Sequence, residues 1–204
     1  MSRELQTIMS SGELTGLYLT GVTASDKVLK QSEVLAITDA LDTRIDSLET
    51  SHSILLSATS VATSQEPTAL DTPLQIEFGP LQTTTDIDVS AAGAITFNTT
   101  GRYIMSPFFQ YGRIGSTGTS ELLNRILLNG AQLGNSLSAR IDSADTLVPW
   151  SSSIIVSVTA GDIITMEIMR DSAGNNSGGL FAVNPTLAGW NDAPCASVQI
   201  YKVN

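Results

Sequence analysis

The chain has 204 residues, of which 42 % are apolar and 15 % charged, and its formal net charge is −10. This length allows one good core plus an appendage, while the negative charge argues against DNA, RNA or an anionic membrane as the main partner. Its one cysteine, Cys195, excludes an internal disulfide, so stability has to come from burial and association. No run approaches the roughly 18 consecutive apolar residues of a membrane span.

Residues 1–31 form a short segment of mixed composition, in which Gly12, Gly16 and Gly21 interrupt any long helix. So short a segment cannot build a packed core, and its apolar side chains stay exposed unless they dock on another molecule. We therefore expect an anchor to a larger assembly, with a flexible tail that carries incidental apolar residues as the alternative. The expected anchor residues are Leu14, Leu17, Tyr18, Leu19 and Val22.

Residues 32–62 have the apolar spacing of one long helix that Ser32 would cap. Apolar and small residues recur at alternating steps of four and three, which predicts the seam of a coiled-coil stalk between copies. An ordinary amphipathic helix packed on a globular core is the alternative. The expected seam consists of Val34, Thr38, Leu41, Ile45, Leu48, His52 and Leu55, followed by Thr59 and Ala62.

Residues 63–75 read as a linker, because Pro67 and Pro73 cannot continue the helix. From Ile76 onward, short apolar or alternating runs are separated by dense turn signals, and Asn129-Gly130 is a strong hairpin signal. Such a series of short strands predicts an antiparallel sandwich or jelly roll over residues 76–204. The expected fold class is therefore mostly β, with an N-terminal α-helical coiled-coil stalk.

The run FNTTGRYIMSPFFQY, at residues 97–111, carries bulky apolar side chains on both faces of a strand. An antiparallel strand normally buries one face and leaves the other to water. We therefore expect a second copy of the chain to cover the other face. One face carries Ile104 and Phe108, and the opposite face carries Tyr103, Met105, Phe109 and Tyr111.

Several motifs after residue 76 resemble, in the right order, those of the jelly roll shared by tumour necrosis factor and the complement globular heads. They are AITFNTTGRYI at 94–104, ILLNG at 126–130, IIVSVTAGDII at 154–164 and ASVQIYKV at 196–203. The resemblance covers roughly residues 76–204. The collagen stalk of complement-type proteins is absent, and the heptad helix occupies its place.

This resemblance implies a homotrimer whose inner sheet packs around a threefold axis through aromatic residues. It places Tyr103 and Tyr201 near that axis, makes Gly101 and Gly161 turn residues, and has Asp162 complete the second hairpin. A trimeric stalk and a trimeric head would reinforce each other's symmetry. The expected head interface consists of Tyr103, Met105, Phe109, Tyr111 and Tyr201.

Few residues suggest chemistry. His52 lies on the stalk, where three copies could bind an anion, water or a metal, or where it is only a tolerated polar seam residue. Asp142 and Asp145 could contribute to a calcium loop or form a solvated acidic loop, and Cys195 reads as a buried inert thiol. Because the sequence has no phosphate-binding loop, paired metal motif or nucleophile elbow, we expect no enzyme and no catalytic, metal or cofactor site.

An anchor, a short stalk and a jelly-roll head resemble the layout of bacteriophage fibres and head-decoration proteins. This implies a trimeric virion surface protein, a head fibre or capsid decoration spike that is assembled in the host cytoplasm. Residues 1–31 would attach it to a capsid or tail protein, and head loops would bind a host-surface glycan or protein weakly.

The first alternative function is a short tail fibre or receptor-binding protein. The second is a secreted cytokine-like or lectin-like adhesive module, against which the lack of a secretory signal in MSRELQTIMSSGEL counts. We expect neither nucleic-acid binding nor insertion into a membrane.

Overall fold

The computed structural model of the chain describes residues 5–10, 13–19, 31–51, 56–115, 117–175 and 177–203. They belong to two compact units, Met1–Ser53 and Ile54–Asn204. Among the described residues, no helix is both long and apolar enough to cross a membrane.

The N-terminal unit contains a hairpin and a helix. Strands β1 (Leu5–Ser10) and β2 (Glu13–Leu19) pair antiparallel, with a shift in register between Ile8 and Met9. The sequence did not predict this hairpin. Val22 lies outside the described residues, whereas β2 carries the other expected anchor residues, which are Leu14, Leu17, Tyr18 and Leu19.

Helix α1 (Gln31–Ser51) contains the first part of the expected stalk. Leu41, on the expected seam, is 51 % exposed in the single chain. Leu35 (55 %) and Ile37 (48 %) lie off the seam and are exposed to a similar extent, so exposure does not single out the seam. The coiled coil therefore stays a prediction. Val34, Thr38, Ile45 and Leu48 also lie on α1, while His52 and Leu55 fall outside the described residues.

The predicted helix over 32–62 is wrong at its C-terminal end, because residues 56–61 form strand β3 (Leu56–Val61) of the other unit. The β-branched residues Thr59 and Val61 are poor helix formers, and β3 pairs with the last strand of the chain. Thr59 is buried, and its hydroxyl donates to the carbonyl oxygen of Phe78 at 2.6 Å. Thr59 is therefore not a seam residue.

The predicted linker 63–75 also belongs to the β unit. Gln65 is buried and exchanges two backbone hydrogen bonds with Leu180. Strand β4 (Leu74–Gln75) pairs with β14. The head therefore begins at β3 instead of residue 76, and Pro67 and Pro73 lie within its loops.

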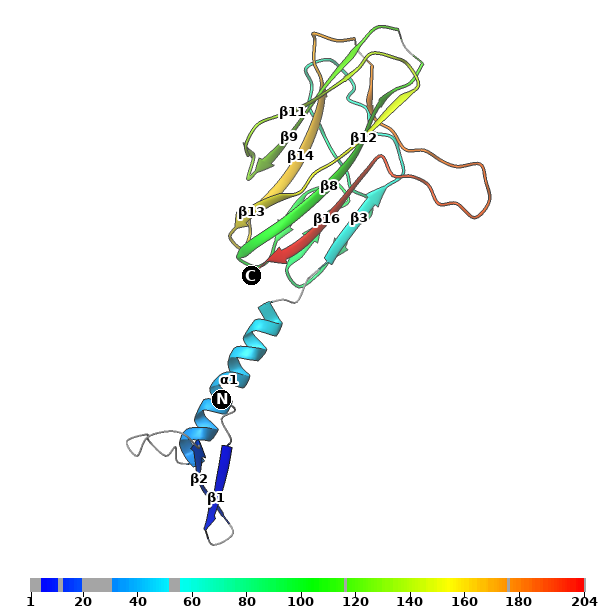
Figure 1. The fold of residues 1–204 in the computed structure, drawn as a ribbon. Helices are drawn as coiled ribbons and strands as arrows, with labels where there is room; N and C mark the ends of the chain where they lie inside the picture. Colours follow the sequence, from blue (N-terminus) through cyan, green and yellow to red (C-terminus); the bar gives the residue numbers. More distant parts are fainter. Residues whose placement is uncertain are drawn as a thin grey trace. The chain divides into compact units, whose positions relative to one another are not determined.

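Two antiparallel sheets make up the C-terminal unit (Figure 1). The β8 sheet is built around the long strand β8 (Gly101–Arg113). Strands β12 (Thr146–Ser151) and β13 (Ile154–Val158) lie along one side of β8. On its other side lie β15 (Gly179–Leu180) and β16 (Ala196–Val203), and β3 follows β16.

The second sheet, named here the β14 sheet, is centred on β9 (Ser120–Leu128) and β14 (Ile163–Arg170). Beside β9 lie β10 (Ala131–Gln132) and β11 (Leu137–Ile141). Beside β14 lie β4 and β7 (Ile95–Phe97), which β6 (Ile87–Val89) and β5 (Gln82–Thr83) follow.

The core lies between the two sheets and takes every second residue of the central strands. Phe97 of the β14 sheet and Tyr103 of the β8 sheet meet with ring centroids 4.7 Å apart. This alternation is the sandwich pattern in which each sheet buries one face. The buried apolar residues come from both sheets and include Ile95, Leu122, Met166, Met105, Val198 and Ile200.

Two hairpins confirm the turn predictions. Asn129 and Gly130 have φ of 51° and 82° and join β9 to β10, which is the left-handed pair that a two-residue hairpin needs. Gly161 has φ of 93° in the β13–β14 turn, where one Asp162 oxygen accepts from the amide and hydroxyl of Thr159 at 2.8 and 2.9 Å. Gly101 differs from the prediction, because it is the first residue of β8.

Candidate functional site

The outer face of the β8 sheet, which points away from the core, carries an apolar row across three strands. Ile104 of β8 pairs with Ile155 of β13 on one side and with Tyr201 of β16 on the other. Paired residues of neighbouring strands share a face of the sheet. Ile155 is 61 % exposed, and Ile104 and Tyr201 are half-buried. Of the expected interface residues, Tyr201 therefore lies on a surface that a second copy can reach.

The other four expected interface residues lie in the core of their own chain. Tyr103 and Met105 are 0 % exposed, Phe109 is 1 % exposed, and Tyr111 is 3 % exposed. This corrects the sequence interpretation, which had the two faces of the strand reversed. The more aromatic face of β8 packs against the β14 sheet, so the opposite face, with Ile104 and Phe108, is the one left at the surface.

A polar network holds Tyr103 in its buried position. Its hydroxyl lies 2.7 Å from Thr99 Oγ1 and 3.0 Å from the Thr99 carbonyl oxygen. Lys202 Nζ lies 2.9 Å from Asp86 Oδ1 and 2.8 Å from Thr99 Oγ1. The hydroxyl of Thr99 also donates to Asp86. A hydrogen bond from Thr99, with help from Lys202, lowers the pKa of Asp86 below its ordinary value.

A serine-lined hollow of about 420 Å³ lies beside the apolar row on the same outer face. Ser106 and Ser153 are hydrogen-bonded across it at 2.8 Å. Hydroxyl groups both donate and accept, so this surface can form hydrogen bonds with an uncharged polar partner. Its lining contains no charged side chain and consists of Ser106, Pro107, Phe108, Ser151, Ser152, Ser153, Ser197 and Gln199.

An apolar groove of about 560 Å³ lies where β13 faces the β9–β10 hairpin; we call it the edge groove. Leu133 (37 % exposed) and Leu137 (36 %) contribute to one side, and Trp150 and Ile155 contribute to the other. Trp150 stacks on Phe109 with ring centroids 5.6 Å apart. Because Ile155 belongs to both, the edge groove and the apolar row form one continuous surface.

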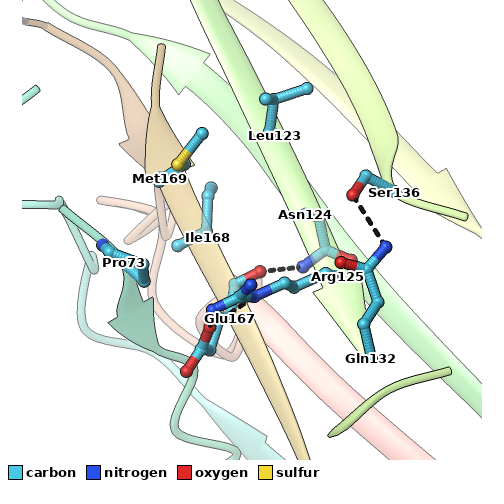
Figure 2. Close-up of a pocket in the computed structure, with 9 residues that line it drawn as sticks. All are labelled: Pro73, Leu123, Asn124, Arg125, Gln132, Ser136, Glu167, Ile168 and Met169. Atoms are coloured by element: carbon cyan, nitrogen blue, oxygen red, sulfur yellow. Dashed lines mark hydrogen bonds and ion pairs between the residues drawn. The ribbon is translucent and has the colours of Figure 1, made fainter. Parts of the chain in front are cut away.

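A smaller hollow of about 120 Å³ lies over β9 and β14 of the other sheet (Figure 2). Arg125 Nη2 and Glu167 Oε2 form an ion pair at 2.7 Å, and Asn124 Nδ2 donates to the Glu167 carbonyl oxygen at 2.9 Å. In Figure 2, Leu123 and Met169 lie farther along the same two strands than this pair. Because the two charges neutralise each other, this hollow offers little to a charged ligand.

The acidic residues considered for calcium are engaged by other groups. Asp142 Oδ1 accepts from Arg140 Nε at 2.9 Å and from Thr119 Oγ1 at 3.1 Å. The hydrogen bond from Arg140 lowers the pKa of Asp142. Within the described residues, no three His, Cys, Asp or Glu side chains come together to hold a metal ion.

Cys195 is buried, as the sequence interpretation expects. Its thiol donates to the Thr63 carbonyl oxygen at 2.9 Å and accepts from Gln65 Nε2 at 3.3 Å. Burial raises the pKa of this thiol, which disfavours the reactive thiolate. His52, the other residue considered for chemistry, lies outside the described residues.

Sequence reasoning missed the edge groove and an exposed loop that carries Trp190. A signal was present, because three long stretches contain no charged residue although the chain has 30 of them. Two of these stretches supply the edge groove and the third supplies most of the loop. They are residues 126–138, 146–161 and 172–191.

No family model matches the chain, and no curated protein matches it. Among solved structures it is similar to Eiger TNF from S. frugiperda, with 12 % sequence identity and a TM-score of 0.42. The alignment covers 74 % of this chain and 93 % of that chain.

Proposed function

We propose that this chain is a non-catalytic structural protein that forms a homotrimer through the outer face of the β8 sheet and displays its β-sandwich as a head. The apolar row carries this proposal. The row runs from Ile155, which is 61 % exposed, across Ile104 to Tyr201, and the described strands place no carboxylate on this face. Contiguous exposed apolar side chains typically mark a protein interface.

The charge distribution supports self-association at this face. The chain carries a net charge of −10, so copies repel one another wherever carboxylates face each other. Arg102 is the one charged side chain on the outer face of the described strands of the β8 sheet. Two copies can therefore bring these faces together without burying an unpaired negative charge.

We propose that the chain has no enzymatic role because several of its acidic groups and its thiol are already engaged by neighbouring groups. Asp86, Asp142 and Glu167 each have a cationic partner within 2.9 Å, on Lys202, Arg140 and Arg125. The thiol of Cys195 is buried with a raised pKa. These are arrangements that stabilise a fold, and none leaves a free acid, base or nucleophile beside a cavity.

The proposed setting is the surface of a virion, as a head fibre or capsid decoration spike. The support is the layout of the chain, in which a β1–β2 hairpin with apolar residues and helix α1 precede the β unit. Residues 1–31 would bind a capsid or tail protein, and the head would bind host-surface glycan or protein weakly. The alternatives are a short tail fibre or receptor-binding protein, and a secreted cytokine-like or lectin-like adhesive module.

Sedimentation equilibrium of the full chain tests the trimer. We expect a mass of three times 21.5 kDa at micromolar concentration. Tyr201→Asp should lower this mass, because it would place three carboxylates in the buried contact. Leu81→Asp is the control, since Leu81 is 64 % exposed outside the apolar row. A wild-type mass of one chain would contradict the proposal.

Quantitative mass spectrometry and antibody labelling of purified virions test the setting. The chain should be present in multiples of three, and electron microscopy should place the label on the capsid. A label confined to the tail tip would favour the tail-fibre alternative. Absence from virions together with recovery from the culture medium would favour the secreted module.

A further inference from the structure

A long loop leaves the β8 sheet between β15 and β16, and Figure 1 shows it extending away from the sandwich on the side of β16 and β3. Its base is closed by two backbone hydrogen bonds between Val183 and Ala193, at 3.0 and 2.8 Å. Residues 184–192 are all exposed, and we call them the Trp190 loop. Pro185 within the loop and Pro194 after it restrict its backbone.

The Trp190 loop presents two large apolar side chains to solvent. Trp190 is 71 % exposed and Leu187 is 66 % exposed. The Trp190 amide donates to the Leu187 carbonyl oxygen at 3.4 Å, so one turn carries both side chains. Tryptophan has a large apolar surface and is enriched among the residues that dominate the energy of protein interfaces. These two side chains form an apolar knob on an extended arm.

The edge groove has the properties that would receive such a knob. It has a volume of about 560 Å³ and is lined mainly by apolar side chains, among them Leu133, Leu137, Trp150 and Ile155. A cavity of this size is in the range that encloses ligands much larger than one side chain. An indole ring that enters it would meet aliphatic and aromatic carbon on both sides.

Charge points to a second copy of this chain as the occupant. No charged residue lines the edge groove, and the Trp190 loop carries none before Asp192 at its end. A chain with a net charge of −10 repels its own copies, so contact is favoured where both surfaces lack carboxylates. The knob and the groove are two such surfaces, since both are mainly apolar.

The knob and the groove lie at opposite sides of the same sheet. In the strand order, the groove borders β13 on one side of β8, while the loop leads into β16 on the other side. A contact between two different patches is heterologous, and repeated heterologous contacts close into a ring when the rotation allows it. Each copy can then give one loop and receive one.

We propose that Trp190 and Leu187 of one copy insert into the edge groove of the next copy around the ring. This inference rests on the proposed homotrimer and adds to it the residues that join neighbouring heads. The apolar row on the outer face is continuous with the groove through Ile155, so both contacts belong to one interface.

The direct test is quenching of Trp190 fluorescence by acrylamide. The chain has two tryptophans, so Trp150→Phe isolates the Trp190 signal and keeps an aromatic ring on Phe109. Because Trp150 itself lines the groove, sedimentation first has to show that Trp150→Phe associates as the wild type does. At a concentration where sedimentation shows the associated form, quenching should be several-fold weaker than in dilute monomer. Adding Leu137→Asp to the groove should restore full quenching, and adding Leu81→Asp should leave it weak.

Two outcomes of this test separate the inference from the proposed function. If the protein is a trimer and Trp190 remains fully quenchable, the inference is overturned while the homotrimer stands. If the protein sediments as a monomer at every concentration, both are overturned. Leu137 and Leu81 are each at least 36 % exposed, and Trp150→Phe keeps an aromatic ring on Phe109, so none of these substitutions should prevent folding.

Mixing two defective variants of residues 54–204 tests the heterologous geometry, after circular dichroism has shown that this unit folds. Trp190→Asp removes the knob and Leu137→Asp blocks the groove, so each alone should weaken association about thirtyfold or more. Their equimolar mixture retains one intact knob and one intact groove, and it should form 1:1 dimers that grow no further. A mixture that sediments as the separate variants do would overturn the proposal.

Discussion

The outer faces of the two sheets differ in charge. On the β14 sheet, Arg140 pairs with Glu121 at 2.9 Å and Arg125 pairs with Glu167 at 2.7 Å. On the outer face of the β8 sheet, the described strands carry one charged side chain, Arg102, beside an apolar row and a serine-lined hollow. One face is therefore suited to water and the other to contact with protein.

This difference shows where a strongly negative chain can meet its own copies. Ion pairs on a surface contribute little to stability, typically 0 to about 1 kcal/mol, so those on the β14 sheet mainly keep that face soluble. The β8 sheet has no such pairs among its described outer residues. The proposed self-association therefore falls on the β8 sheet, and contact with solvent falls on the β14 sheet.

The largest expected effect comes from removing the edge strand of the β8 sheet. A chain of residues 65–204 lacks β3, whose six residues pair with β16, and loses the buried bond of Thr59 to Phe78. We expect it to unfold, or to lose more than about 4 kcal/mol of stability. A chain of residues 54–204 keeps β3 and should remain folded. Urea titration of both chains, followed by circular dichroism, measures the difference in stability. Equal stability of the two lengths would show that β3 is not part of the sheet.

Tyr103 and Tyr201 sharpen the contrast between the inner and outer faces of one sheet. Tyr103→Ala should cost about 3–5 kcal/mol, since it leaves a cavity in the core and breaks the bonds to Thr99. Tyr201→Ala should cost the single head less than about 1 kcal/mol, because Tyr201 is half-buried on the outer face. Urea titration of dilute monomer measures both. Equal costs would contradict the assignment of the two faces.

Asp86→Asn tests the network that supports Tyr103. Because the folded-state pKa of Asp86 lies below its ordinary 3.8, the carboxylate stabilises the fold above about that pH and loses this effect as pH falls through the folded pKa. At pH 7 we expect Asp86→Asn to cost about 1–3 kcal/mol. The difference from wild type should disappear in strong acid. A stability difference between Asp86→Asn and wild type that stays constant into strong acid would exclude the ion pair with Lys202 as its cause.

The smallest expected effect is on the outer face of the β14 sheet. Arg125→Gln and Glu167→Gln each remove one partner of a pair whose side chains are 41 % and 19 % exposed. Each should change stability by less than about 1 kcal/mol and leave the mass of the assembly unchanged. A loss of association in either variant would mean that this sheet also meets a second copy.

Local sequence signals predicted the turns of the head and its antiparallel β fold. Asn129-Gly130 and Gly161-Asp162 form the expected hairpins because their backbone and side-chain chemistry acts within a few residues. The pattern along residues 97–111 predicted a strand with apolar side chains on both faces, and β8 (Gly101–Arg113) has them. Alternation alone does not tell which face meets the other sheet, so the assignment of Tyr103 to the surface was wrong.

Long-range pairing explains the other errors. The heptad spacing continued through Thr59 and Ala62, but Thr59 lies opposite Val198, which is remote in sequence. Tertiary pairing overrides a weak local preference of this kind. The edge groove joins 126–137 to 150–157, so it exists only once β9 and β13 are folded. Absence of charge in these stretches was the one local sign of it.

A matched pair of substitutions measures the contrast between the two outer faces most directly. Ile104 and Leu123 are both half-buried and lie on central strands, one on each sheet. In sedimentation equilibrium, Leu123→Asp should retain the wild-type mass of three times 21.5 kDa, while Ile104→Asp should sediment as a folded single chain. If both variants kept the trimer, or if Leu123→Asp alone lost it, the β8 sheet would not be the association face.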